Sequence, residues 1–417
     1  MASAAAPASE GKKQVRVWID MCADLFHFGH ANALRQVHGR GTIVAPFLFF
    51  SFFFWSPSKP KINHENENTM VQAKLMGDVL VVGVHPDEEV EKHKGPPVMT
   101  QEERLRVVEA CKWVDEVTLE APYTTTLATL DKFNIDFCVH GEDISTNSEG
   151  VDSYQEVKDA GRFQLIKRSV GVSTTDLVGR MLLLTKSHFN KSAEEAAKSL
   201  PDELPRAQPK QLERLASAPL STNTIFLFSD GKSAKPDDKI VYMDGGFDLF
   251  HAGHVNALEQ ARKLGTYLIV GVHSDQEINA MKGENFPIMN LHERVLCVLS
   301  CKYVDEVIIG APMKLTKEWL EQWNISVVAH GDERDAYHPI HPEGVDNYAA
   351  AREMGIYHEV RSTSGLTTHA IVERIIEHRL KYQKRNEVRE KKNAIIEEQL
   401  KQKKEQAAAA AKQQQSG

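Results

Sequence analysis

Short apolar runs alternate with helical patterns along most of the chain. In the C-terminal half, apolar runs predict buried strands at residues 239–243 and 267–273, and two further strands at 306–309 and 325–330. Residues 256–264 carry apolar side chains at helical spacing, and residues 15–19 resemble the first of these strands. Strands that alternate with helices predict an α/β fold, in which a parallel sheet is covered by helices on both faces.

The two halves of the chain share a series of motifs in the same order. Residues 20–30, which end in His27-Phe-Gly-His30, match residues 244–254, which end in His251-Ala-Gly-His254. The motifs at residues 82–85, 112–117 and 140–141 recur at residues 270–273, 302–307 and 330–331. The sequence therefore indicates a tandem duplication of a domain of about 145 residues, not a solenoid of short repeats.

This duplication predicts the domain boundaries. We expect a disordered leader at residues 1–13, a first domain at 14–186, a linker at 187–238, a second domain at 239–385 and a charged tail at 386–417. Five prolines favour the linker interpretation. The tail has the composition of a solvated helix that frays into disorder.

The first copy carries an insert that the second lacks. The distance between matching motifs falls from 224 to 188 residues after the histidine motif, which places 36 extra residues at 37–72. Its apolar run of 13 residues at 43–55 is shorter than the roughly 20 residues of a membrane span. Its prolines predict a broken or displaced helix. We favour a retained intron, with a poorly folded first half, over a loop that touches a membrane.

Charge and cysteine content narrow the function classes. A net charge of −8 argues against a chain-wide basic surface, so we expect no nucleic-acid partner. Five cysteines without a CxxC pair argue against a disulfide framework or a zinc site. The N-terminus has no apolar signal region, so we expect a cytoplasmic protein with at most peripheral contact at the endoplasmic reticulum.

The repeated histidine motif is the strongest indication of chemistry. His27 and His30, like His251 and His254, follow a predicted strand and precede a predicted helix. A helix N-terminus favours anionic phosphate groups, and imidazoles can donate to oxygens that gain charge during phosphoryl transfer. A pair of histidines that only stabilise a turn is the alternative. Their recurrence at equivalent places favours a phosphate site.

Further side chains could serve the same site. Lys94 and Lys282, each followed by glycine, could neutralise charge between phosphates, although a solvated loop lysine explains either one alone. Arg168 could clamp a phosphate. Ser173 and Thr174 could cap a helix and donate hydroxyl groups, which an ordinary N-cap would also explain.

These motifs together resemble a known family. DGGFDLFHAGH, KG, HER, YVDEV and GVSTTD, in this order, are similar to the HxGH nucleotidyltransferases, and specifically to the cytidylyltransferases of phospholipid synthesis. The tandem pair resembles the ethanolamine-phosphate cytidylyltransferases. The resemblance implies two Rossmann-like domains, each with a five-stranded parallel sheet. It also implies transfer of CMP from CTP to phosphoethanolamine, with release of pyrophosphate, in phosphatidylethanolamine synthesis. Mg²⁺ would accompany CTP, with no metal site of the protein's own.

The resemblance also implies roles for single residues. His27 and His30 would bind the triphosphate, and Lys94 would bridge the two reacting phosphates. Asp24 and Arg104 would help to place the nucleotide. Such a reaction depends on positioning and charge neutralisation, because no covalent nucleophile is needed.

The remaining roles complete the predicted first site. Arg168, Ser173 and Thr174 would hold the β- and γ-phosphates. Asp143 and Tyr154 are weaker candidates for the amine end of the acceptor. In the second domain the equivalent residues are His251, His254, Lys282 and Arg294.

Each copy departs from the family pattern. Met21, Cys22 and Ala23 replace the Gly245-Gly-Phe247 turn, where they could crowd CTP, and Ser362 stands opposite Arg168. We expect the first copy to be active. An impaired nucleotide-binding scaffold and an enzyme for another phospho-alcohol are the alternatives, and a homodimer stays open.

Overall fold

The computed structural model describes residues 14–38, 76–142, 145–147, 151–167, 172–182, 225, 227–283, 285–331 and 346–388. The leader, most of the insert and linker, and the tail from residue 389 lie outside the described residues, so the predictions about them stay predictions. Residues 379–388 are helical, so one helix spans the predicted boundary at residue 385 between the second domain and the tail.

Each half contains one parallel sheet of five strands. The first has strands β1 (Arg16–Met21), β2 (Val79–Val84), β3 (Glu116–Thr118), β4 (Phe137–Gly141) and β5 (Phe163–Ile166). The second has strands β6 (Ile240–Gly245), β7 (Tyr267–Val272), β8 (Glu306–Ile309), β9 (Val327–Gly331) and β10 (Tyr357–Val360). The orders are β3-β2-β1-β4-β5 and β10-β9-β6-β7-β8, which are the same topology. The predicted fold class, two tandem Rossmann-like domains, is confirmed.

Helices follow the strands in matching order. The first half has α1 (Phe28–Val37), α2 (Asp87–Lys94), α3 (Gln101–Glu109), α4 (Leu127–Lys132), α5 (Gln155–Asp159) and α6 (Thr174–Leu182). The second half has α10 (Ala252–Arg262), α11 (Asp275–Lys282), α12 (Leu291–Leu299), α13 (Lys317–Gln322), α14 (Ala349–Glu353) and α15 (Thr368–Glu377).

Local sequence signals start several of these helices. Thr100 and Glu103 form a capping box at α3, and Asn290 and Glu293 form the equivalent box at α12. Each side chain satisfies a backbone N–H that the first helical turn leaves without a partner.

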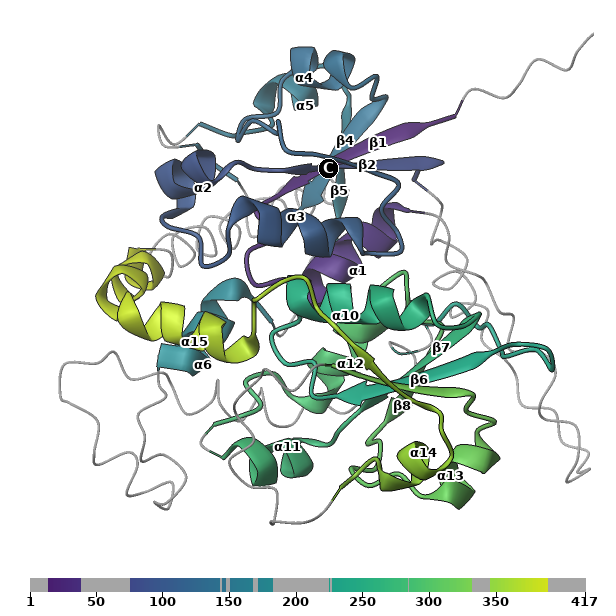
Figure 1. Cartoon of the computed structure of the whole chain (residues 1–417). Helices are drawn as coiled ribbons and strands as arrows, with labels where there is room; N and C mark the ends of the chain where they lie inside the picture. Colours follow the sequence, from purple (N-terminus) through teal and green to yellow (C-terminus); the bar gives the residue numbers. More distant parts are fainter. Residues whose placement is uncertain are drawn as a thin grey trace, which may run out of the picture.

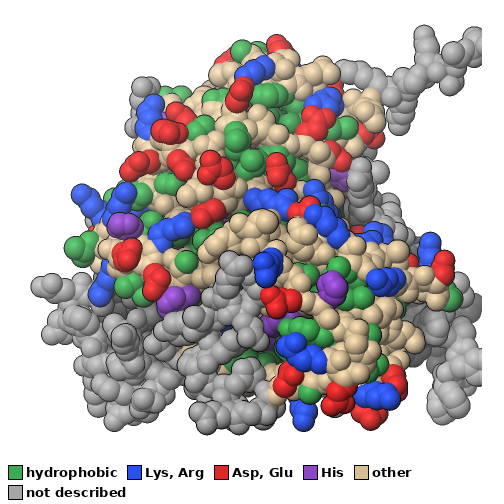
Figure 2. Space-filling view, in the orientation of Figure 1, with side chains coloured by type: hydrophobic (Ala, Val, Ile, Leu, Met, Phe, Trp, Pro, Cys, Tyr) green, Lys and Arg blue, Asp and Glu red, His purple; other side chains and the backbone are tan. Residues whose placement is uncertain are grey.

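The two halves pack through one side of each sheet. Helices α1 and α3 lie against α12 and α10 between the sheets, and α6 lies beside α15 (Figure 1). A single apolar cluster runs through both halves at this level, whereas the outer faces carry smaller clusters of their own. Lys and Arg side chains form a band at the same level, with Asp and Glu among them (Figure 2).

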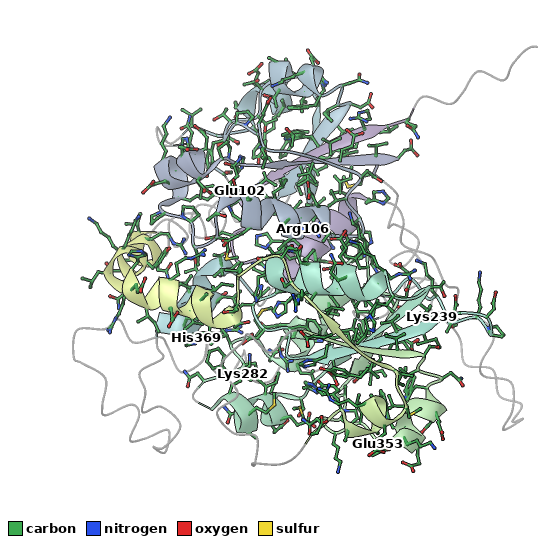
Figure 3. All side chains as sticks on the ribbon, in the orientation of Figure 1. Glu102, Arg106, Lys239, Lys282, Glu353 and His369 are labelled. Atoms are coloured by element: carbon green, nitrogen blue, oxygen red, sulfur yellow. The ribbon has the colours of Figure 1, made fainter. Side chains whose placement is uncertain are left out.

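Polar contacts across this boundary occur in symmetric pairs. The Lys112 amide donates to the carbonyl of Ser300 at 2.9 Å, and the Lys302 amide donates to the carbonyl of Ala110 at 2.8 Å. Arg106 extends from α3 toward α10, where it pairs with Glu259 (Figure 3). Because equivalent residues bind each other reciprocally, the chain is an internal pseudo-dimer.

The predicted disruption of the helix after the histidine motif is wrong. Helix α1 runs unbroken to Val37, and His38 caps its end. His38 takes the place of Arg262 in the second half. Nε2 of His38 lies 2.8 Å from the Asp115 carboxylate, and Nε of Arg262 lies 3.5 Å from the equivalent Asp305 carboxylate. Val37 and His38 therefore belong to the described fold, which places the start of the insert two residues later than the motif spacing predicts.

The described end of the linker is part of the first half's core. Phe228 is fully buried and packs edge-on against Trp113, and Lys112 pairs with Asp230 at 2.7 Å. Among the described helices, none combines the length and apolar character that a membrane crossing requires.

Candidate active site

The histidine motif lies where the strand order of the first sheet reverses, between β1 and β4. Ligands of open parallel sheets bind at this point, beyond the carboxyl ends of the strands. His27 is the N-cap of α1 and is 6% exposed. The rings of His27 and His30 are 4.0 Å apart between centroids. Both imidazoles therefore stand at the positive end of a helix, as predicted.

Backbone contacts fix the tautomers of these histidines. Nδ1 of His27 accepts the Gly29 N–H at 3.1 Å, and Nδ1 of His30 accepts the His27 N–H at 3.3 Å. A neutral imidazole with an accepting Nδ1 carries its proton on Nε2. Each ring is therefore set to donate an N–H from Nε2, which suits a phosphate oxygen.

Steric crowding explains why the position between the two histidines of each motif is glycine. A Cβ atom at Gly29 would lie 2.8 Å from Cε1 of His27, and one at Gly253 would lie 2.4 Å from the Leu366 carbonyl. The ring can fold back onto the first helical turn only because this position has no side chain.

Lys94 is the last residue of α2. Its Nζ lies 5.5 Å from the centroid of the Tyr123 ring. Burial lowers the pKa of His85, and Asp20 and Lys94 act on the same imidazole with opposite sign. The lysine, this carboxylate and His85 thus share one electrostatic environment at the ends of β1 and β2.

Asp24 ties the histidine turn to the loop after Lys94. Its carboxylate accepts the N–H groups of Val98 at 3.0 Å and Met99 at 2.9 Å. The Thr174 hydroxyl donates to the Asp24 carbonyl at 2.8 Å, which brings the start of α6 to the same turn. The structure therefore joins three of the segments that the sequence assigned to the site.

Ser173 and Arg104 are engaged in local structure. The Ser173 hydroxyl accepts the Asp176 N–H at 3.1 Å, as an N-cap does. Arg104 is 1% exposed and donates to the carbonyls of Cys22 at 2.6 Å and His85 at 2.8 Å. Arg104 thus braces the ends of β1 and β2, and its predicted contact with nucleotide stays a prediction.

Two predicted residues lie outside the described residues. These are Arg168, the expected phosphate clamp, and Asp143, a candidate for the amine end.

Tyr154, the other candidate for the amine end, reveals a residue that sequence reasoning missed. Its hydroxyl donates to Asp20 at the end of β1, which also accepts the Thr125 hydroxyl and the Trp18 indole N–H. Asp20 is 4% exposed, and no Lys or Arg of the described chain pairs with it. Burial, together with the nearby Asp20 carboxylate, raises the pKa of the Tyr154 hydroxyl well above its usual range. The sequence did offer one signal for Asp20, because an aspartate stands at the equivalent position of the second copy, Asp244.

The second half repeats this arrangement. His251 and His254 form the same cap, with ring centroids 3.8 Å apart. Burial lowers the pKa of His251 to about 3, and burial together with His251 and Lys282 lowers the pKa of His254. The Lys282 ammonium, at the end of α11, is therefore close enough to act on both rings. Arg294 braces this half as Arg104 braces the first.

The altered turn of the first half is accommodated inside the protein. A Cβ atom at Gly245 would lie 3.3 Å from the Phe247 ring, but Ala23 replaces that ring in the first half. Met21 therefore fits at the end of β1, where it packs into the core. Its predicted effect on CTP stays a prediction.

Comparison with known proteins decides the family. The cytidylyltransferase-like family model matches residues 68–180 and 242–393. The ethanolamine-phosphate cytidylyltransferase of Dictyostelium discoideum is 51% identical, over 93% of this chain and 98% of its own length. The mouse enzyme is 44% identical, over 94% of this chain and 93% of its own. The chain belongs to the ethanolamine-phosphate cytidylyltransferase family. It is therefore a nucleotidyltransferase, as its motifs predicted.

The same family extends to plants. The ethanolamine-phosphate cytidylyltransferase of Arabidopsis thaliana is 40% identical, over 91% of this chain and 84% of its own length. Because relatives of this family match across both halves, the tandem arrangement belongs to the family and is not peculiar to this chain.

Proposed function

We propose that this chain transfers CMP from CTP to phosphoethanolamine, in the phosphatidylethanolamine pathway, and that the first half is the active one. A phosphate oxygen of phosphoethanolamine attacks the α-phosphorus of CTP. The bond from that phosphorus to the oxygen of the β-phosphate breaks, which gives CDP-ethanolamine and pyrophosphate. The observation that carries the proposal is the pair of Nε2 donors on His27 and His30 at a helix N-terminus, within a chain of this family.

The first half supplies position and charge for this reaction. His27 and His30 donate to the triphosphate of CTP, and Lys94 stabilises the negative charge that the two reacting phosphates bring together. Arg168 holds the β- and γ-phosphates together with Ser173 and Thr174, whose hydroxyls exchange their bonds to Asp176 and to the Asp24 carbonyl for phosphate oxygens when CTP binds. Asp24 and Arg104 position these groups indirectly, because Asp24 binds the Val98 amide and Arg104 binds the Cys22 carbonyl.

We propose Asp20 as the partner of the acceptor's ammonium group. The carboxylate is buried with three neutral hydrogen-bond donors, Tyr154, Thr125 and Trp18, so its charge is solvated but not neutralised. A buried carboxylate in this state gains most from a cation that also brings N–H donors. Ethanolamine offers such donors, whereas the quaternary ammonium of choline does not.

We propose that Mg²⁺ enters the site as a companion of CTP. In the described chain, no three His, Cys, Asp or Glu side chains gather into a metal-binding group. Mg²⁺ commonly binds substrate phosphates with few protein ligands, and there it would reduce the negative charge of the triphosphate. A homodimer and peripheral membrane contact stay predictions from the sequence.

An assay with labelled CTP and the full chain tests this function. We expect CDP-ethanolamine from phosphoethanolamine and far less product from phosphocholine or glycerol phosphate. Absence of product with every acceptor would favour the nucleotide-binding scaffold, and a different preferred acceptor would favour the alternative substrate.

A further inference from the structure

The C-terminal helical segment of the second half lies against the loop that follows Lys94 in the first half. This segment consists of α15 and the helix at residues 379–388. It lies beside α6 in Figure 1, where it is drawn in yellow. Its buried side chains reach across the boundary between the halves.

Three donors of this segment bind three consecutive carbonyls of the loop. Arg385 donates to Pro96 at 2.6 Å, Tyr382 donates to Pro97 at 3.1 Å, and Arg374 donates to Val98 at 2.7 Å. Proline has no N–H group, so the two prolines can be held through their backbones only at their carbonyls.

Arg385 also reaches the histidine turn. Its Nη1 lies 3.3 Å from Oδ2 of Asp24, whose carboxylate binds the Val98 and Met99 amides. The Arg385 side chain is 5% exposed, and its stem lies 3.0 Å from where a Cβ atom of Gly95 would stand. One guanidinium thus joins the loop after Lys94 to the turn that carries His27.

The described part of the second half holds its equivalent loop with an overlapping set of bonds. Asn279, from the same half, donates to the carbonyl of Phe286 at 2.9 Å, and Arg180 donates to that of Ile288 at 3.1 Å. The Asp248 carboxylate binds the Ile288, Met289 and Leu249 amides. The arginine that reaches Asp24 thus gives the first half a contact across the boundary that these bonds do not reproduce.

We propose that Arg385 is a positioning residue of the first active site, supplied by the second half. It fixes the loop at residues 95–99 and Asp24 against each other, which holds Lys94 over the reacting phosphates. This inference rests on the proposed function, in which Lys94 acts in the first half. It gives the second half a role in catalysis that does not require its own histidines to turn over substrate.

Steady-state kinetics of the full chain test the proposal. We compare Arg385→Ala and Arg385→Lys with Lys384→Ala, a control on the exposed face of the same helix. Loss of positioning lowers kcat when the affected group acts mainly in the transition state. We expect Arg385→Ala to lower kcat about 10- to 100-fold with both KM values within about threefold, and Arg385→Lys to recover part of the loss.

A double-mutant cycle identifies Lys94 as the group through which Arg385 acts. We expect Lys94→Ala with Arg385→Ala to match Lys94→Ala alone, because the two changes remove the same contribution. Hydrogen exchange should become faster at the Val98 and Met99 amides in Arg385→Ala and not in Lys384→Ala.

Several results would overturn the proposal. These are additive effects in the cycle, unchanged exchange at the two amides, or a kcat for Arg385→Ala equal to that of the control with only a lower melting temperature. A wild-type chain that makes no product overturns the proposed function as well. In that case the exchange measurement still shows separately whether Arg385 holds the loop.

Discussion

Arg180 binds both carboxylate oxygens of Glu293 across the boundary between the two halves, at 2.8 and 2.9 Å. Arg374 and Glu103 form the equivalent pair in the opposite direction, at 2.9 and 3.1 Å. Both glutamates also cap their own helices, so each pair links a helix N-terminus in one half to α6 or α15 of the other.

Removal of either arginine should destabilise the chain, and Arg180 should matter more. The Glu293 side chain is 4% exposed, compared with 18% for Glu103, so Glu293 would lose its partner in a poorly solvated place. We expect Arg180→Ala to lower the free energy of unfolding by about 3 kcal/mol and Arg374→Ala by about 1 to 2 kcal/mol. Denaturant unfolding measures both. Equal losses would contradict the burial argument.

His30→Ala and His254→Ala form a matched pair that tests which half is active. Both remove the same capping contact, so both should cost about 1 kcal/mol of stability. We expect only His30→Ala to reduce kcat by 100-fold or more, on the order expected when one preorganised donor is lost. Turnover lost only in His254→Ala would show that the active half is the second one.

Stability should fall as the solution is acidified below the ordinary pKa of histidine. Burial lowers the pKa of His251 to about 3, so the unfolded chain binds more protons than the folded chain between about pH 6.5 and 3. The contribution of this group to stability is complete above pH 6.5 and is lost as the pH falls, by about 1.4 kcal/mol per pH unit.

His251→Asn tests this dependence, because asparagine keeps an acceptor for the Gly253 N–H. We expect the loss of unfolding free energy between pH 6.5 and 5 to shrink by about 1 to 2 kcal/mol in this variant. His358→Asn, an exposed histidine on β10, is the control and should leave the loss unchanged. The same pH dependence in His251→Asn and the wild type would count against a depressed pKa.

Asp20→Asn should weaken the binding of phosphoethanolamine more than the binding of CTP. Loss of the carboxylate charge removes the proposed partner of the ammonium group, while the histidine turn keeps its contacts. We expect KM for phosphoethanolamine to rise about 10-fold or more and KM for CTP to change less than about threefold. Asp244→Asn in the second half is the matched control. Parallel changes in both KM values would assign Asp20 a structural role.

Deletion of residues 37–72 should give a more stable and fully active chain. Ala73 and Lys74 would then occupy the places of Val37 and His38, as Ala261 and Arg262 do in the second half. His38 and Gly77 lie side by side in a β-bridge, so the shorter connection fits, and its closure should cost about 2 kcal/mol less. Thermal unfolding and turnover measure the outcome; lost activity would show that the insert has a function.

Genomic DNA tests the origin of the insert directly. A retained intron requires GT at its first codon and AG at its last, in a register that preserves the reading frame. The structure places the boundary about two residues later than the motif spacing does, so both registers should be read. Absence of these borders from both would exclude the splicing explanation.

The duplication, the strand-helix alternation and the residues of the histidine motif can be read from the amino-acid sequence alone. The strands β6, β7, β8 and β9 fall close to their predicted places, because each contains a short apolar stretch that alternates with helical segments. β5 and β10 escaped prediction because both of their central residues are exposed and leave no apolar run.

How these parts act together depends on the folded chain. The motif shows a pair of histidines, but the backbone contacts that set their Nε2 protons depend on the folded turn. Asp20 looks like one more motif residue until Tyr154, 134 positions away, donates to it. Arg385 lies 361 positions from Asp24, and no local pattern encodes a contact at that separation. Sequence periodicity reports which face of an element is buried, whereas the packing of the two halves determines which side chains meet.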